Sequence, residues 1–180
     1  MKIVLNPMQG AVIDGKELRL GMTYEEVCSA MGRPDSDEAD RQYRKAYYAV
    51  SDSCISFEFN AKTDQLTYIE FSNGSDELQP ELFGVSVFPM KADELFGLLK
   101  DRNNGGIIAN DNGYSYVFKE LGISIWRESI PEDIEEMIAE AEEDGEPMDE
   151  EDIAEEWKLA NYWATVGVGG KEYIKAAESY

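Results

Sequence analysis

Apolar residues recur at helical spacing near the start of the chain, at i, i+3, i+4 and i+7 of one stretch: Tyr24, Val27, Cys28 and Met31. This spacing puts the four side chains on one face of a helix. Thr23 and Glu26 match a capping box, in which a hydroxyl and a carboxylate each satisfy a free backbone N–H group. Gly32 and Pro34 follow as helix-ending residues. The pattern predicts a short helix over residues 24–31.

The next stretch alternates apolar and polar residues with the period of a β-strand. Three runs show this alternation, residues 46–50, 54–59 and 66–71. In the second run, Ile55, Phe57 and Phe59 point to one face of the predicted strand. The polar segment 60–65 supplies a turn before the third run. The sequence therefore predicts a helix followed by an antiparallel meander.

The same order of elements returns 68 residues later. The second helical stripe consists of Ala92, Leu95, Phe96 and Leu99, and the matching strands are residues 114–118 and 123–126. A gapless alignment of 39 residues holds five identities, Met22/Met90, Glu26/Glu94, Tyr48/Tyr116, Ile55/Ile123 and Ser56/Ser124. Average composition gives about two by chance, so the matched periodicity is the stronger sign of an internal duplication. Asn112-Gly113 predicts a hairpin turn that places a strand over 107–110 beside residues 114–118.

Carboxylates dominate the stretch that follows the second unit. Between residues 128 and 156 there are sixteen acidic residues and no Lys or Arg: Glu128, Glu132, Asp133, Glu135, Glu136, Glu140, Glu142, Glu143, Asp144, Glu146, Asp149, Glu150, Glu151, Asp152, Glu155 and Glu156. The whole chain has 38 acidic and 16 basic residues, so without this stretch the net charge falls from −22 to −6. Such concentrated charge opposes folding by self-repulsion and favours fast, salt-sensitive capture of a cationic partner.

The acidic stretch also carries helical signals. Ser129 and Glu132 match a second capping box, and Pro131 suits a first helical turn. The apolar residues of this helix form a narrow stripe: Ile130, Ile134, Met137, Ile138 and Ala141. Three more elements are predicted after it, an acidic helix over about 149–160, a strand over 163–169 and a helix over 172–178. Gly167-Val-Gly-Gly170 lacks the pattern of a phosphate-binding loop and is expected in a strand or turn.

Composition restricts the chemistry open to this chain. It has no histidine, which excludes a Ser–His or Cys–His nucleophile and removes the common zinc ligand. Cys28 and Cys54 lack metal-ligand spacing and are expected to be buried free thiols. The four acids at 149–152 are hard oxygen ligands without the spacing of an EF-hand, which leaves a divalent-cation site as a minor alternative. We expect no metal, no cofactor and no enzymatic activity.

Charge and hydropathy also limit where the chain acts and what it binds. With 43% hydrophobic residues it can bury a core, and it has neither a signal-peptide core nor an apolar run of about 18 residues. We therefore expect a cytoplasmic protein without a membrane partner. The strong negative charge argues against nucleic acid as a partner.

Two resemblances bear on fold and function. The run Gly21-Met-Thr-Tyr-Glu-Glu-Val27, followed by Met31-Gly-Arg-Pro34, resembles the start of domains in the β-lactamase-inhibitor and outer-membrane assembly lipoprotein class. This resemblance implies helices packed on an antiparallel sheet, duplicated in the inhibitor, over residues 15–127. The lipidated N-terminal Cys of the lipoproteins is missing here, so their membrane role does not carry over. Residues 116–128 and 162–169 resemble segments of small acidic immunity proteins of bacterial polymorphic-toxin systems, which neutralise a toxin by covering its active surface.

Together these observations predict an α+β fold in a single domain, 1–180. It would hold two helix-plus-antiparallel-sheet units, 15–75 and 83–128, and an acidic helical and C-terminal extension over 129–180. The leading hypothesis is an immunity or inhibitor protein that binds a basic protein toxin, such as a nuclease. Its partner-binding residues would be Glu132, Glu135, Glu136, Glu140, Glu142 and Glu143. Two alternatives stay open: an interaction domain whose acidity serves only solubility, and, more remotely, a carboxylate-dependent hydrolase.

Overall fold

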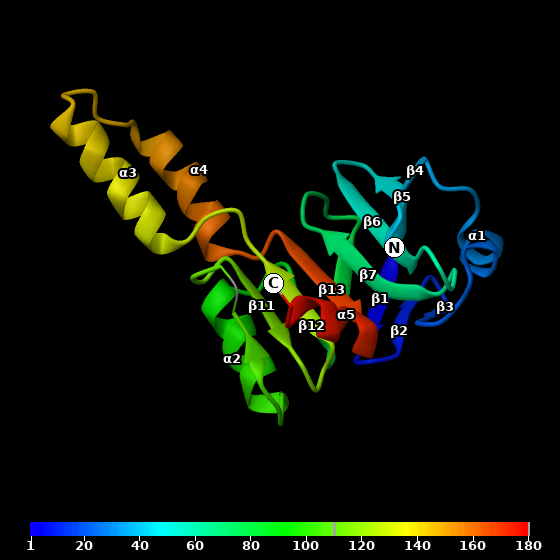
Figure 1. The fold of residues 1–180 in the computed structure, drawn as a ribbon. Coiled ribbons are helices and arrows are strands. Elements are labelled where there is room, and N and C mark those ends of the chain that lie inside the picture. The colour runs from blue at the N-terminus through cyan, green and yellow to red at the C-terminus, as the bar shows by residue number, and fades with distance from the viewer. Residues whose placement is uncertain (110, 180) are drawn as a thin grey trace.

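The computed structural model describes residues 1–109 and 111–179, and it confirms the α+β class, with helices and two sheets (Figure 1). The helices are α1 (Tyr24–Met31), α2 (Ala92–Arg102), α3 (Pro131–Glu143), α4 (Glu150–Asn161) and α5 (Lys171–Ala177). The larger sheet has the order β10-β11-β12-β13-β7-β6-β5-β4. The smaller sheet has the order β3-β2-β1-β8-β9. No helix in the described ranges is both long and apolar enough to cross a bilayer.

The larger sheet is built from two antiparallel meanders of four strands. The first meander holds β4 (Ser36–Ala39), β5 (Tyr43–Val50), β6 (Ser53–Asn60) and β7 (Leu66–Ser72) and follows α1. The second holds β10 (Ile107–Ile108), β11 (Ser115–Phe118), β12 (Ile123–Trp126) and β13 (Thr165–Gly169) and follows α2. Their last strands, β7 and β13, pair antiparallel and join the two units into one sheet. The predicted pair of helix-plus-sheet units is therefore present.

The position of β13 explains where the second unit departs from the first. β7 follows β6 after a short turn, whereas β13 follows β12 only after α3 and α4. The acidic helices therefore interrupt the second meander between its third and fourth strands. The segment predicted as an extension over 129–180 thus contains a strand from the centre of the larger sheet.

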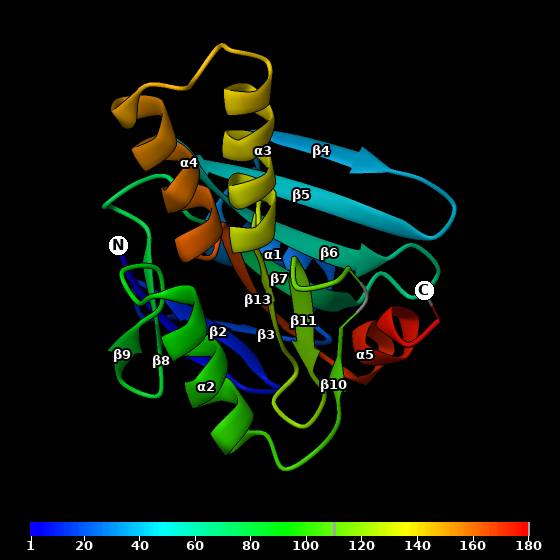
Figure 2. The same cartoon turned by 90° about the vertical axis from the view of Figure 1, so that its left-hand side faces the viewer.

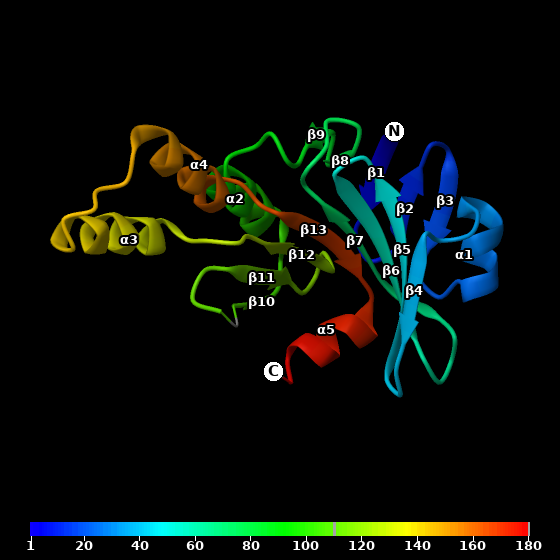
Figure 3. The same cartoon turned by 90° about the horizontal axis from the view of Figure 1, so that it is seen from above.

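Strand alternation decides which face of the larger sheet is buried. Ile55, Phe57 and Phe59 of β6 are fully buried, while the residues between them are only half-buried. The buried side chains share one core with α1, α2 and the smaller sheet. The opposite face carries α5, which lies away from the smaller sheet (Figure 3). One face of the sheet thus builds the core, and the other is only partly covered.

The smaller sheet was not predicted. Its strands are β1 (Lys2–Asn6), β2 (Gly10–Ile13), β3 (Lys16–Arg19), β8 (Gln79–Leu82) and β9 (Val85–Ser86). β1 pairs parallel with β8, so the segments that precede and follow the first unit meet in this sheet. Each strand has five residues or fewer, which is too short for a strong periodic signal.

The predicted hairpin turn at Asn112-Gly113 has the expected backbone. Both residues have positive φ, 40° and 110°, as a tight turn of the hairpin type requires. β10 is shorter than the strand predicted over 107–110, because its pairing with β11 covers only Ile107 and Ile108. Asn110, the last residue of that predicted strand, lies outside the described residues.

Candidate functional site

The acidic helices form a hairpin that projects from the body of the molecule (Figure 1). We call residues 131–161, which comprise α3, α4 and the loop between them, the acidic hairpin. α3 packs on α4, and α4 in turn contacts α2 (Figure 2). Ile134 is buried at the inner end of α3, while Ile138, Ile153 and Trp157 are half-buried. The narrow apolar stripe therefore holds the two helices to each other and leaves their other faces to solvent.

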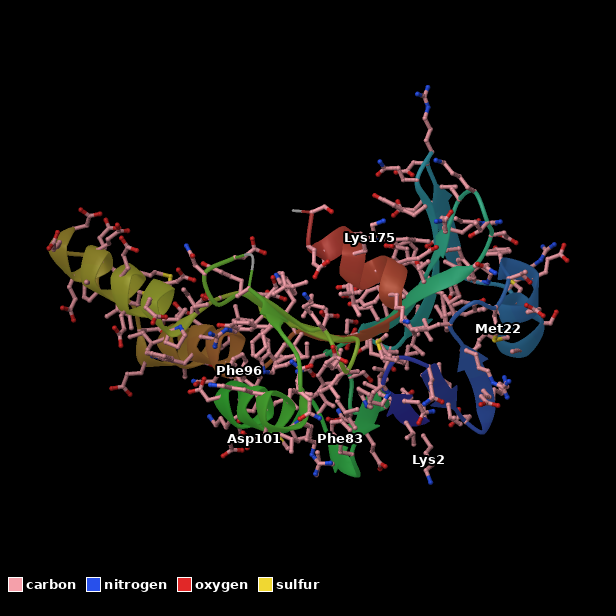
Figure 4. All side chains as sticks on the ribbon, turned by 60° about the horizontal axis from the view of Figure 1, so that its bottom comes forward. Lys2, Met22, Phe83, Phe96, Asp101 and Lys175 are labelled. Atoms are coloured by element: carbon pink, nitrogen blue, oxygen red, sulfur yellow. The ribbon has the colours of Figure 1, made fainter. Side chains whose placement is uncertain are left out.

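The predicted partner-binding residues lie together on α3. All six are exposed: Glu132, Glu135, Glu136, Glu140, Glu142 and Glu143. Within residues 1–109 and 111–179, the four ion pairs join other residues and none includes an acid of the hairpin. Figure 4 shows oxygen-tipped side chains on several sides of the two helices. The hairpin therefore presents an anionic surface that the described part of the molecule does not neutralise.

The start of α3 differs from the predicted capping box. The carboxylate that caps it belongs to Asp133, not Glu132: Asp133 Oδ2 accepts hydrogen bonds from the Ile130 backbone N–H (3.0 Å) and Ser129 Oγ (3.3 Å). The prediction of Glu132 was wrong because the helix begins one residue later, at Pro131 with Ile130 as N-cap. The Tyr114 hydroxyl also donates to Asp133. This bond, more than the others, holds the pKa of Asp133 below its usual range.

Arg127 fixes the base of the hairpin from inside the protein. Its side chain is buried, and Nη1 donates to the Ala160 carbonyl at the end of α4 (2.8 Å). Nε donates to the Gly113 carbonyl (3.0 Å), in the turn before β11. The guanidinium also lies over the Trp163 ring, 5.1 Å from its centroid. The planar guanidinium offers donors in several directions, so one residue ties the exit of β12, the turn before β11 and the end of α4 together.

Trp163 joins this base to α2. Its side chain is buried, and Nε1 donates to the Ala92 carbonyl (3.0 Å) in the first turn of α2. Tyr116 packs edge-on against the same ring. Neither Arg127 nor Trp163 was singled out from the sequence. The available signal was that Arg127 is the last base before the acidic run.

The remaining chemical candidates have structural roles. Asp149 caps α4 by accepting from the backbone N–H groups of Glu151 (3.0 Å) and Asp152 (2.9 Å). The residues that the structure describes contain no group of three or more Cys, Asp or Glu placed to hold a metal ion. Cys28 and Cys54 are free thiols, as expected, but they are half-buried, so the expectation that they are buried was wrong. Partial burial nevertheless raises the pKa of Cys54.

Comparison with known proteins gives no family for this chain. No protein-family model matches it, and no curated protein matches its sequence. A search of solved structures gives a cysteine-rich secretory protein from Staphylococcus aureus, with 12% identity and a TM-score of 0.41. The match covers 97% of this chain and 50% of that protein, so the chain spans half the length of this neighbour.

Proposed function

We propose that this protein is a non-catalytic binding protein that captures a basic protein, in the manner of an immunity or inhibitor protein that neutralises a basic toxin such as a nuclease. The observation that carries the proposal is the acidic hairpin, which projects from the body with fifteen acids against one base, Lys158, and whose acids form no ion pair among the described residues. A field of one sign on a projecting element attracts an oppositely charged partner during diffusion. Association rates then reach roughly 10⁸ M⁻¹s⁻¹ at low salt.

The local energetics of α3 support a role in binding. Glu132, Glu136 and Glu140 follow each other at i,i+4 on the exposed side of the helix. Each such pair of like charges costs roughly 0.2–0.5 kcal/mol of helix stability. The last turn of α3 holds no basic residue to complement the helix dipole. A helix that keeps this much unfavourable charge is expected where the charge serves to bind a partner.

The anchoring of the hairpin supports the same proposal. Arg127 holds the end of α4, and the Tyr114 hydroxyl holds the start of α3 through its hydrogen bond to Asp133. Because the hairpin is already held in one orientation, less conformational entropy is lost when a partner binds.

A matched pair of charge reversals tests the proposal. Glu132 and Glu25 are both exposed and are the second residues of α3 and α1, so reversal to Lys changes the helix dipole interaction in the same way at both sites. The two helices lie at opposite ends of the molecule (Figure 1). The ligand is the basic protein that the unmodified chain retains from a lysate of its source at about 50 mM salt and releases at about 500 mM.

Stopped-flow association with that protein is then measured at both salt concentrations. We expect Glu132→Lys to slow association several-fold at low salt, with a smaller effect at high salt, and Glu25→Lys to change it far less. Equal effects of the two variants, or no effect of ionic strength, would contradict capture by the hairpin. The acidity would then serve solubility.

A further inference from the structure

The partly covered face of the larger sheet holds a second surface, separate from the acidic hairpin. An open groove of about 1060 Å³ runs over this face. Its floor comes from β5, β6, β7, β11, β12 and β13, and α5 forms one wall. We call it the sheet groove. Its size is that of a site for an extended peptide segment or a drug-sized ligand.

The wall and floor of the sheet groove are held rigidly. Tyr173 of α5 stacks on Tyr68 of β7, with ring centroids 4.1 Å apart and planes 4° apart. Tyr68 Oη shares a buried hydrogen bond of 2.7 Å with Ser124 Oγ of β12. Gly167 of β13 leaves the space for this arrangement, because a Cβ there would lie 2.1 Å from Tyr68 Oη. The groove is thus formed before any ligand binds.

Two exposed aromatic side chains mark opposite corners of the sheet groove. Tyr43 of β5 is 36% exposed and Trp126 of β12 is 40% exposed, and both line the groove. The pairing registers put them four strands apart across the sheet and six residues apart along it. With usual strand spacings this is about 25–30 Å. An extended segment of about eight residues covers that diagonal.

The charged side chains that line the groove between these two aromatic residues are mostly negative. Among the described residues, the lining contains four carboxylates and one basic residue: Glu58, Glu70, Asp111, Glu172 and Lys45. Lys45 Nζ lies 3.2 Å from Glu58 and 5.2 Å from the centroid of the Tyr43 ring, so it already engages those two groups. Glu70 accepts from Tyr68 Oη (3.1 Å) and Thr165 Oγ1 (3.2 Å), which leaves its negative charge in place. The floor therefore keeps a net negative charge beside exposed aromatic rings.

Carboxylates next to aromatic faces select ammonium and guanidinium groups, by ion pairing and by cation–π attraction. The protein already uses this combination elsewhere, where Arg44 lies over the Tyr24 ring and pairs with Asp37. We propose that the sheet groove binds an extended segment rich in arginine or lysine. The idea that this segment belongs to the partner captured by the hairpin rests on the proposed function. The proposed affinity of the groove for such a segment is independent of that function.

A defined peptide tests the groove without the natural partner. The probe is a blocked peptide of four Arg-Ser repeats, and the control peptide has Gln in place of each Arg. Binding is measured by calorimetry at about 150 mM salt. The protein is the full chain with the six site glutamates of α3 changed to Gln, which lowers the competing charge by removing six of the fifteen acids of the hairpin. Retained binding of the arginine peptide, but not of the glutamine peptide, is the expected result.

Groove variants then locate the binding. In that background, Trp126→Ala, and separately Glu70→Gln with Glu172→Gln, should each weaken peptide binding about tenfold. The control pair Glu25→Gln with Glu94→Gln removes the same charge from exposed positions on α1 and α2 and should change binding less than twofold. Amide shift mapping on the protein with no groove substitution should place the peptide on β5, β7 and β12. Equal binding of both peptides, or binding that no groove variant weakens, would overturn the groove proposal while leaving capture by the hairpin untouched.

Discussion

Changing Glu136 to Lys should stabilise the hairpin while impairing its function. Glu136 lies one turn from Glu132 and one turn from Glu140, and all three are exposed. Counting only the i,i+4 neighbours and leaving out Asp133 at i−3, reversal replaces two like-charge pairs by two opposite-charge pairs. Each removed repulsion and each new attraction contributes roughly 0.2–0.5 kcal/mol, so α3 should gain about 0.8–2 kcal/mol at low salt. The same substitution weakens the field proposed to capture a basic partner.

Native-state amide exchange is the assay for this gain, because α3 leaves the sheet between β12 and β13 and can open without unfolding the core. Protection of α3 amides should rise in Glu136→Lys at about 20 mM salt, and the rise should shrink at about 500 mM. Glu136→Gln removes only the repulsions and should give about half the gain. Glu25→Lys is the control, since no acidic residue lies three or four positions from Glu25. Unchanged or lower protection in both Glu136 variants at low salt would refute the argument that α3 gives up stability for charge.

Two further predictions concern the sheet. Gly167→Ala should lower the free energy of unfolding by about 1–3 kcal/mol in urea titrations, because its Cβ would overlap the buried Tyr68. Gly97→Ala on α2, where the new Cβ meets nothing within 4 Å, should instead be neutral or stabilising, and a loss equal to that at Gly167 would contradict the steric reason. Burial and the hydrogen bond to Glu38 raise the pKa of Tyr47 to about 12. The contribution of Tyr47 to the free energy of unfolding is therefore complete below about pH 10 and is lost as pH rises from about 10 to 12. Tyr47→Phe should flatten that decline in unfolding titrations at several pH values. An unchanged slope would contradict the role of Tyr47.

Local signals in the sequence predicted the repeated units well. The Thr23–Glu26 capping box forms as expected, with the Thr23 backbone N–H 2.8 Å from the Glu26 carboxylate, and α1 spans the predicted residues. The alternation in residues 54–59 gave the correct buried face, because a single shift of register would expose Phe57 and Phe59. These features depend on residues close in sequence. They can be predicted before any tertiary contact is known.

Features that depend on distant contacts could not be predicted. The place of β13 between β12 and β7 follows from pairings across an insertion and across the two units. Asp133 rather than Glu132 caps α3 because the helix begins at Pro131, and Tyr114, nineteen residues earlier, also donates to that carboxylate. The role of Arg127 depends on carbonyl groups fourteen and thirty-three residues away. The acidic residues of the candidate site were visible in the sequence, but their anchoring was not.

The two proposed surfaces meet at one end of β12. Trp126, which lines the sheet groove, is the last residue of β12, and α3 begins at Pro131. A partner drawn in by the hairpin would therefore arrive beside the groove. Exposed charge mainly sets how fast a complex forms, whereas buried aromatic contacts mainly set how slowly it dissociates. The insertion of α3 and α4 after β12, rather than at a distant turn, thus places the element suited to capture next to the surface suited to retention.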